Sequence, residues 1–426
     1  MASIQPFRGT RYNGEHVKLG GVLAPPYDVI TDARRDELYG RDMRNIVRVD
    51  YGLRYPDDVA GDRDAYTRAA AFLHSWLELG VLVRDDQPGY YVVDHHFKHP
   101  DGGERMRRGL LATVAATPWE QSDLRPHERT MSGPKLDRLA LMRATRTQTS
   151  PVFAIWRDGN HIDDVLAGFV SDHALLGGRI DGEIGSEKLL VWRIADPVQV
   201  AAITESFRDA ALYIADGHHR YETAATYAAE RRAAQPDAPP DAPFERCLVY
   251  LAAADDPGIT ILPTHRLVRP GPGIAFSLDD LWARLDDAYE TEAVDGVSAA
   301  LAIAASLHDT HHAFAVVAHD GVAVLRRPRR AGGSPRDRLD AAVLESEVLR
   351  PAGVTPDAIV AGALAYTREA AALETAVRSG EAVLGFGITP VSTSDVIAVA
   401  DAGETMPQKS TYFYPKVPTG LVVLEV

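Results

Sequence analysis

The sequence contains a single cysteine, Cys247, and no long uncharged apolar run. One thiol excludes an internal disulfide and a metal cluster held by several thiolates. A membrane-spanning helix needs about 20 consecutive apolar residues, and the chain has no such segment. Residues 1–9 also lack the basic region and the apolar stretch of a signal peptide. We therefore expect a cytoplasmic protein with no membrane partner.

Several common motifs are missing as well. There is no Gly-x-x-x-x-Gly-Lys-Ser/Thr loop, no Gly-x-Gly-x-x-Gly opening a helix, and no Gly-x-Ser-x-Gly elbow. These absences exclude the commonest kinase, dehydrogenase and hydrolase interpretations.

An excess of positive charge is missing too. Acidic residues number 60 against 45 basic ones, which gives a formal net charge of −15. The densest basic run, Arg-Arg-Pro-Arg-Arg at 326–330, is short and precedes glycine and serine, so we expect an exposed loop. A small-molecule substrate is favoured, and no nucleic-acid partner is expected.

The 426 residues alternate expected strands, such as 212–215, with expected helices, such as 135–145 and 221–232. This alternation predicts a mixed α/β or α+β fold, and the length predicts two domains. A proline- and glycine-rich stretch at 269–273 suggests the regions 1–270 and 271–426. The sequence leaves open whether the second region is a separate domain or returns over a site in the first.

The sharpest motif is Ala-Asp-Gly-His-His-Arg-Tyr-Glu at 215–222, where an apolar strand meets a helix. A helix start offers unpaired N–H groups that favour phosphate, and glycine allows close approach. Arg220 is expected to clamp phosphate, and the histidines to donate hydrogen bonds or bind metal. The carboxylate is a candidate Mg²⁺ ligand. The plainer alternative is a helix capped by its aspartate. The candidates are Asp216, Gly217, His218, His219 and Arg220.

A second cluster combines a carboxylate with cations on a loop that enters a helix. Glu128 is a candidate general base that takes a proton from a substrate hydroxyl. The neighbouring cations suit an anionic substrate. A solvated loop with surface ion pairs explains the same residues equally well. The other members are His127, Arg129, Thr130, Lys135 and Arg138.

A third cluster, Met-Pro-Gln-Lys-Ser-Thr-Tyr-Phe-Tyr-Pro-Lys, spans 406–416. Its polar members, Lys409, Ser410, Thr411 and Lys416, are candidate phosphate contacts. A terminal strand that completes a sheet would use the same aromatic residues. The histidine pairs at 95–96 and 311–312 lack further ligands at a recognisable spacing, so we expect surface or strand-end histidines there.

Four motifs together resemble one large prokaryotic family, the domain of unknown function ten-fifteen. They are APPYDV at 24–29, PHERT at 126–130 with KLDRL at 135–139, ADGHHRYE at 215–222, and MPQKSTYFYPK at 406–416. The resemblance spans essentially the whole chain. The family name implies no reaction.

The DGHHR element is more distantly similar to the phosphate-contacting motif of free serine kinases in the ParB/sulfiredoxin-like superfamily. This resemblance implies a ParB/sulfiredoxin-like phosphate-binding core with additional α/β elements. It also implies a nucleotide, ATP or ADP, held with Mg²⁺ at residues 216–220. The kinases use a glutamate base, but this chain has no clear match to their glutamate segment, so Glu128 is chosen because it lies in a family motif.

Three hypotheses follow from the motifs and the resemblance. In the first, the protein transfers a phosphoryl group to a small hydroxylated metabolite such as serine, with Arg220, Lys135 and a C-terminal lysine stabilising the charge. In the second, water replaces the acceptor and the protein is a phosphatase of the phosphoserine type. In the third, it is a non-catalytic regulatory protein that binds a nucleotide. The oligomeric state stays open.

Overall fold

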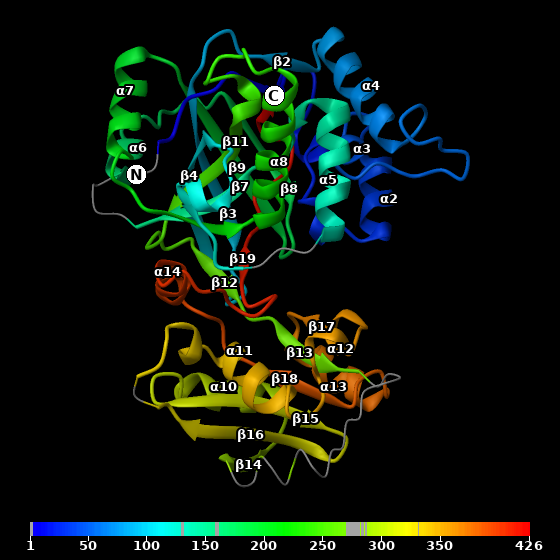
Figure 1. Cartoon of the computed structure of the whole chain (residues 1–426), viewed down its shortest axis with the longest axis vertical. Helices are drawn as coiled ribbons and strands as arrows, with labels where there is room; N and C mark the ends of the chain where they lie inside the picture. Colours follow the sequence, from blue (N-terminus) through cyan, green and yellow to red (C-terminus); the bar gives the residue numbers. More distant parts are fainter. Residues whose placement is uncertain are drawn as a thin grey trace. The chain divides into compact units, whose positions relative to one another are not determined.

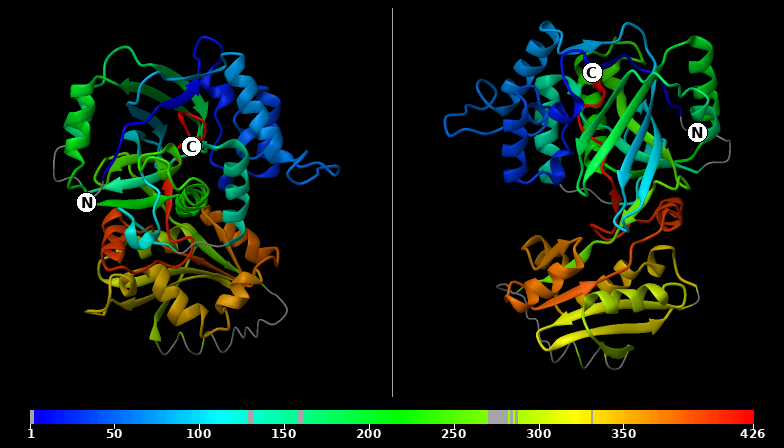
Figure 2. Two further views of the ribbon diagram at one scale, coloured as in Figure 1. Left: turned by 45° about the horizontal axis from the view of Figure 1, so that its top comes forward. Right: turned by 180° about the vertical axis from the view of Figure 1, so that it is seen from behind.

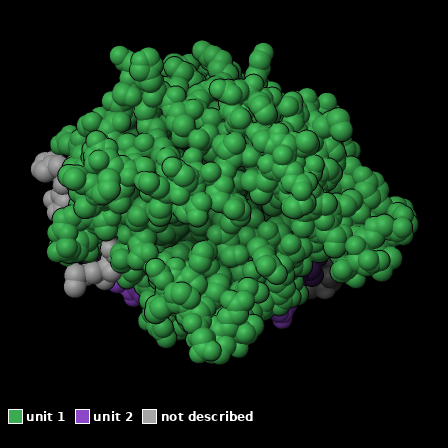
Figure 3. Space-filling view, turned by 90° about the horizontal axis from the view of Figure 1, so that it is seen from above, with its two compact units in different colours: residues 1–126, 130–260, 415–426 green, residues 127–129, 261–414 purple. Residues whose placement is uncertain are grey.

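The structure is a computed structural model that describes residues 3–128, 132–157, 162–269, 282, 285, 288–330 and 332–426. It divides into two compact units, which Figure 3 colours separately. Unit 1 comprises residues 1–126, 130–260 and 415–426. Unit 2 comprises residues 127–129 and 261–414. Among the described residues, no helix has the length and apolar character needed to cross a bilayer.

Unit 1 is built on an eight-stranded mixed sheet. The β10–β5 and β11–β7 pairs are parallel, and the other neighbours are antiparallel. The middle strands are apolar on both faces, as expected for strands covered on both sides. In sheet order the strands are β5 (Leu124–Arg125), β10 (Leu212–Asp216), β7 (Val152–Trp156), β11 (Arg246–Ala253), β4 (Glu104–Ala115), β3 (Tyr90–Lys98), β9 (Ser186–Ile194) and β8 (Leu176–Asp181).

Helix α8 (His218–Ala234) lies against this sheet and beside α5 (Ser132–Thr145), as Figure 1 shows. Its small buried residues, Ala224 and Ala228, allow a close approach to β7 and β11. The remaining helical segments are α1 (Leu19–Val22), η1 (Tyr27–Val29), α2 (Asp32–Arg41), α3 (Val47–Asp50), α4 (Ala65–Glu78), η2 (Trp119–Gln121), α6 (Ile162–Ala167), α7 (Pro197–Ser206) and η3 (Pro243–Glu245).

A small second sheet in unit 1 joins segments from the beginning and the end of the sequence. Its order is β2 (Leu82–Arg84), β1 (Gly9–Tyr12), β20 (Val423–Glu425), β6 (Thr147–Gln148). Thr10 pairs with Val423, and the Thr10 hydroxyl donates to Glu425 over 2.6 Å. Residues 415–426 are therefore part of the unit 1 framework.

Unit 2 is a six-stranded antiparallel sheet with helices on both faces (Figure 2). Alternation along β15 separates two cores, because Phe314 and Val316 pack with η5, whereas Ala315 and Val317 pack with α10 and α13. In sheet order the strands are β14 (Glu290–Val294), β16 (Gly321–Pro328), β15 (His311–Ala318), β18 (Leu384–Gly387), β13 (His265–Val268) and β17 (Leu364–Thr367).

The helical segments of unit 2 are α10 (Val297–Ser306), η4 (Arg336–Arg338), α11 (Asp340–Val343), the π-helix η5 (Leu344–Leu349), α12 (Pro356–Val360), α13 (Ala370–Arg378) and α14 (Thr393–Asp401). Two short strands, β12 (Thr260–Leu262) and β19 (Tyr412–Tyr414), pair with each other. The expectation of a mixed α/β fold is confirmed by both units.

Candidate functional site

The turn between β10 and α8 depends on a glycine. Gly217 has φ +95° and ψ 29°, in the left-handed region that L-residues rarely adopt. A Cβ atom added there would lie 2.8 Å from Nε of Arg220. Helix α8 begins directly after it, at His218, rather than at 221 as the periodicity predicts. Glycine offers no side chain to cap the helix, so the N–H groups of the first turn carry no cap from this position.

Under this turn lies a largely buried cluster of three charges. The Asp216 carboxylate accepts hydrogen bonds from Nζ of Lys416 and from Nη2 of Arg220. The Arg220 side chain is 10% exposed and that of Lys416 is 9% exposed. Nη1 of Arg220 donates to Oγ of Ser150 over 2.8 Å and to the carbonyl of Pro151. Arg220 therefore ties the start of α8 to the loop that precedes β7.

The opposite charges of this cluster stabilise one another in their ionised forms. Burial alone would raise the pKa of Asp216, but Lys416 and Arg220 outweigh it and hold that pKa well below its usual range. Burial would likewise lower the pKa of Arg220, whereas Asp216 and Asp28 raise it. Both groups are therefore ionised at neutral pH. An aspartate held in this state anchors cations and is a weak general base.

A small cavity of about 40 Å³ lies beside Arg220. Asp50 lines it and is 2% exposed, and its Oδ1 accepts from Oγ1 of Thr149 over 2.6 Å and from Nη1 of Arg138 over 3.2 Å. Oδ2 of Asp50 is buried and has no hydrogen-bond partner among the described residues. The Arg138 guanidinium stacks over the ring of Tyr27 at 4.0 Å. A polar cavity of this size has room for ordered water, which needs roughly 10–15 Å³ per molecule.

Aromatic residues and a carboxylate surround the first turn of α8. Glu222 accepts from Nζ of Lys135 over 2.6 Å and from the indole of Trp119 over 2.7 Å. The Trp119 ring stacks on the Tyr221 ring with centroids 4.5 Å apart, and the centroid of the His218 ring lies 6.5 Å from that of Trp119. His218 is buried and His219 is half-buried. The charge of Lys135 is thus already balanced by Glu222.

In unit 2 the structure brings His127 and Glu128 of the second cluster close to part of the third. Nε2 of His127 lies 3.1 Å from Oγ1 of Thr411, and the His127 carbonyl accepts from the amide of Met406 over 2.8 Å. Oε1 of Glu128 accepts from the Lys409 amide over 3.4 Å, at a residue whose φ is +58°.

The remaining polar residues of this region are also held in place. The Ser410 hydroxyl donates to the Pro407 carbonyl over 2.6 Å. Arg266 is 3% exposed, and burial lowers its pKa to about 10 although Tyr366, Glu345 and Glu128 oppose the shift. Arg129 and Thr130 lie outside the described residues. Glu128 therefore lies in an environment that contains a buried cation.

The predicted residues fall into both units. Unit 1 holds Asp216, Gly217, His218, His219, Arg220, Lys135, Arg138 and Lys416, and unit 2 holds His127, Glu128, Lys409, Ser410 and Thr411. Sequence reasoning missed Asp50, Ser150 and Trp119, which lie outside every motif. The sequence analysis identified the motif at 24–29, which contains Tyr27, but assigned no role to the Tyr27 ring.

Two histidines of the predicted pairs are buried. His95 is 1% exposed in the middle of β3, where Nε2 lies 2.6 Å from Oε2 of Glu187. His312 is 3% exposed, and its Nδ1 lies 2.8 Å from Oδ1 of Asp340. The prediction of surface or strand-end histidines is wrong at His95, whereas His312 does lie at the end of β15. Each of the two rings is buried against a carboxylate. A buried polar group needs such a partner.

The donor set around Asp216 does not fit Mg²⁺. Its two oxygens already accept from two cations, and a divalent ion would have to displace them. Across the described residues, no group of three or more His, Cys, Asp or Glu side chains is arranged to hold a metal ion. The expectation that Asp216 binds Mg²⁺ therefore gains no support from the geometry.

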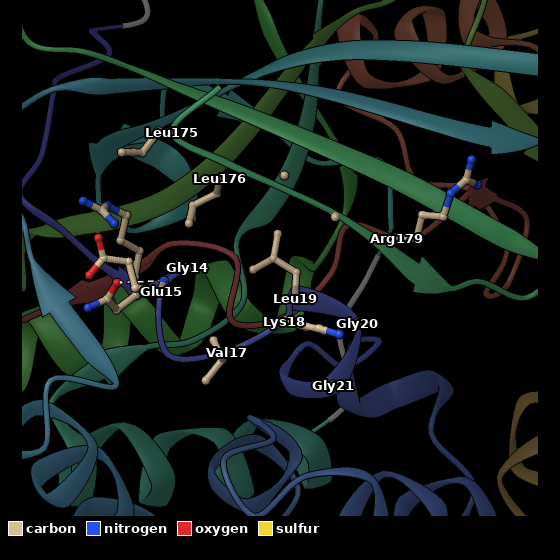
Figure 4. Close-up of a pocket in the computed structure, with 14 residues that line it drawn as sticks. Gly14, Glu15, Val17, Lys18, Leu19, Gly20, Gly21, Leu175, Leu176 and Arg179 are labelled. Atoms are coloured by element: carbon tan, nitrogen blue, oxygen red, sulfur yellow. Dashed lines mark hydrogen bonds between the residues drawn. The ribbon is translucent and has the colours of Figure 1, made fainter. Parts of the chain in front are cut away.

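A larger hollow of about 810 Å³ in unit 1 lies between the segment 11–21 and β8 (Figure 4). Glycine permits this close approach, because a Cβ on Gly20 would lie 2.3 Å from the carbonyl oxygen of Arg179. Arg11, one of its cations, pairs with Asp85 over 3.0 Å. None of the predicted site residues lines this hollow, so the α8 start remains the candidate site in unit 1.

Comparison with solved structures finds distant likenesses. A conserved hypothetical protein from Pyrococcus furiosus matches with 12% identity and a TM-score of 0.36, covering 74% of this chain and 94% of that one. A free serine kinase in complex with AMP matches with 12% identity and a TM-score of 0.37, covering 74% of this chain and 91% of that one. SbnI from Staphylococcus aureus, truncated at its C-terminus, matches with 13% identity and a TM-score of 0.35, covering 74% and 87%.

No curated protein matches the chain. A family model does, over residues 4–342, which include the α8 start and the segment around Glu128. The chain belongs to the family described as Protein of unknown function (DUF1015).

Proposed function

We propose that the protein is a phosphoryl-transfer enzyme that binds a nucleotide phosphate at the start of α8 and acts on a small hydroxylated metabolite. The observation that carries this proposal is the turn at Gly217. A left-handed glycine ends a buried strand and opens a long helix whose first turn presents His218 and His219. The N–H groups at a helix start and the positive end of the helix dipole favour a phosphate there.

The proposal gives Arg220 a different role from the clamp that its sequence position suggests. Both of its terminal nitrogens donate to protein groups, namely Asp216, Ser150 and Pro151. In the proposal Arg220 is a positioning residue that fixes the Gly217 turn. The backbone amides of the turn and the His219 side chain then contact the phosphate, while the buried Arg220 and Lys416 add positive charge beneath it.

The assignment of residues 1–270 to a ParB/sulfiredoxin-like core is part of this proposal, and so is a nucleotide donor, ATP or ADP. Both come from the resemblance of the DGHHR motif to free serine kinases, which makes serine the first substrate to test. Glu128 stays the proposed general base. No step is assigned to Mg²⁺, because the donor set around Asp216 does not fit it.

Phosphorus NMR on the purified full chain tests the proposal. The protein is incubated with L-serine plus ATP or ADP, or with phosphoserine alone, each with Mg²⁺ and with a chelator. His219→Ala and Glu128→Ala are expected to lower turnover at least about 100-fold if these residues contact the reacting groups. His74→Ala is the matched control, since His74 is 75% exposed on α4.

Each outcome has a defined meaning. Phosphoserine formation from serine supports the kinase, and phosphate release from phosphoserine supports the phosphatase alternative at the same site. Saturable nucleotide binding without turnover would support the hypothesis of a regulatory nucleotide-binding protein and contradict that of an enzyme. Turnover that is unchanged in both variants would show that these residues do not form the active site.

A further inference from the structure

Unit 2 contains a concave site that lies outside the candidate functional site and includes part of the basic run at 326–330. A cavity of about 420 Å³ opens between the end of β16, the turn that leads into η4, and the π-helix η5. Its volume is within the range of roughly 300–1,000 Å³ typical of small-molecule pockets. Six arginines line it: Arg327, Arg329, Arg330, Arg336, Arg338 and Arg350.

The charge of this cavity is opposite to that of the chain. The whole sequence carries a formal net charge of −15, whereas only three carboxylates, Asp337, Glu345 and Glu347, accompany the six arginines. Two of these carboxylates are already paired. Glu347 receives a bidentate bond from Arg327 over 2.9 and 2.6 Å, and Glu345 pairs with Arg350 over 2.9 Å.

Three guanidinium groups are left without a carboxylate. Within the described part of the chain, Arg330, Arg336 and Arg338 form no side-chain hydrogen bond or ion pair with protein. Nε of Arg336 is buried and has no acceptor there. A buried donor without an acceptor costs free energy, and an anion in the cavity would supply the acceptor.

One cation of the cavity is held in place by protein groups, and the lining restricts what the cavity can bind. Arg329 is fixed by Asp340 over 3.0 Å and by the carbonyl of His308 over 2.7 Å. Gly332 and Gly333 adopt φ +87° and +80°, so the chain turns tightly here. No aromatic residue is among the described lining residues other than His312, so the cavity offers no large ring for a base to stack on.

We propose that this cavity binds a small polyanion of the class of phosphorylated metabolites, held by Arg330, Arg336 and Arg338. Guanidinium groups recognise phosphate and carboxylate through paired hydrogen bonds, and several of them select a multiply charged ligand. A polycarboxylate shares this chemistry, so the test includes one. Because the cavity lies wholly within unit 2, the proposal does not depend on the function proposed for α8.

Calorimetric titration of the full chain with pyrophosphate tests this proposal, with citrate and a single-stranded DNA oligonucleotide as comparison probes. The double variant Arg330→Ala/Arg336→Ala is expected to weaken pyrophosphate binding by about tenfold or more, since two charge-assisted contacts are lost. Arg326→Ala is the matched control, because Arg326 precedes the lining residue Arg327 on β16 and pairs with Glu290 and Glu292 outside the cavity.

The controls separate folding from binding. The two replaced side chains have no protein partner, so the double variant should unfold at the temperature of the unchanged protein. Arg338→Ala provides a second, single substitution that should weaken binding in the same direction. Stronger binding of pyrophosphate than of citrate identifies phosphate as the recognised group, and the reverse order assigns a polycarboxylate. Unchanged binding in the variants, no binding of either small anion, or binding of DNA alone overturns the proposal.

Discussion

Lys416 donates a hydrogen bond to Asp216 across 200 positions of sequence. The two residues belong to motifs that the sequence presents separately, and the structure joins them in one part-buried ion pair within unit 1. Asp216 thereby receives two cations, and the turn that opens α8 rests on them. The segment around Lys416 is thus part of the candidate site.

Replacing Lys416 by Met should destabilise unit 1. Asp216 loses one of two cationic partners but keeps Arg220, so we expect a loss of about 2–3 kcal/mol, below the roughly 3–5 kcal/mol of a buried charge left entirely alone. Urea denaturation measures this loss. Lys188→Met, at an exposed position of β9, should cost about 0–1 kcal/mol. A double-mutant cycle with Asp216→Asn should show a coupling energy, and additive effects would contradict the pairing.

Gly217→Ala should destabilise the protein more than another left-handed glycine does. The substitution places a Cβ 2.8 Å from Arg220, in addition to the strain of the backbone. Gly61→Ala is the matched control, because Gly61 has φ +77° and no atom within 4 Å of an added Cβ. We expect about 1–2 kcal/mol for Gly61→Ala from the left-handed backbone. Gly217→Ala should exceed it by about 1–3 kcal/mol of steric overlap. Equal losses by thermal unfolding would disprove the close approach.

His265 should make the protein less stable in mild acid. Burial and the neighbouring Arg266 lower the pKa of His265 to about 4. Between the unfolded value of about 6.5 and this folded value, the unfolded state binds a proton that the folded state does not. Stability therefore falls as pH decreases through this window, by up to about 3 kcal/mol.

Comparing the unfolding free energy of the unchanged protein and His265→Gln at pH 7 and pH 4.5 measures this effect. The glutamine oxygen can still accept from the Ile388 amide, which now donates to Nδ1 of His265 over 3.2 Å. The variant should lose less stability on acidification. His319→Gln, at an exposed position of unit 2, should follow the unchanged protein. A parallel response of all three proteins would refute the assignment.

Asp50→Asn tests the small cavity beside Arg220. The substitution keeps the shape of the side chain but removes the charge that faces the buried Arg138. Arg138 retains Asp137 over 2.6 Å, so we expect a loss of about 1–3 kcal/mol. Asp57→Asn, whose side chain is 74% exposed, should be nearly neutral. Thermal unfolding compares the two, and equal melting temperatures would show that Asp50 contributes no net stability.

Local patterns in the sequence predicted local structure well. The apolar strand, the glycine and the helix around 217 follow from hydrophobic periodicity and from the freedom of glycine at positive φ. The helix begins three residues earlier than the periodicity indicates, because His218 and Tyr221 are buried although the first turn contains polar residue types. Helix boundaries depend on such tertiary burial.

Contacts between residues far apart in the chain could not be predicted from the sequence. The partners of Arg220 are Ser150 and Pro151, about 70 positions away, and no periodicity connects them. The basic run at 326–330 was expected to be an exposed loop, but its first residues lie in β16 and Arg327 is 7% exposed. A strand can bury an arginine when a carboxylate distant in sequence, such as Glu347, balances the charge of its guanidinium group. A single sequence does not identify that partner.

The interrupted course of unit 1 has a consequence for the order of folding in the cell. Residues 261–414 leave the ribosome before 415–426, yet β20 and Lys416 belong to the unit whose other strands were made first. Throughout that interval β1 lacks one neighbour, and Asp216 lacks its lysine. An unfinished chain therefore carries an open sheet edge and an incomplete charge cluster. Translation itself thus delays completion of the candidate site until Lys416 and β20 have been synthesised.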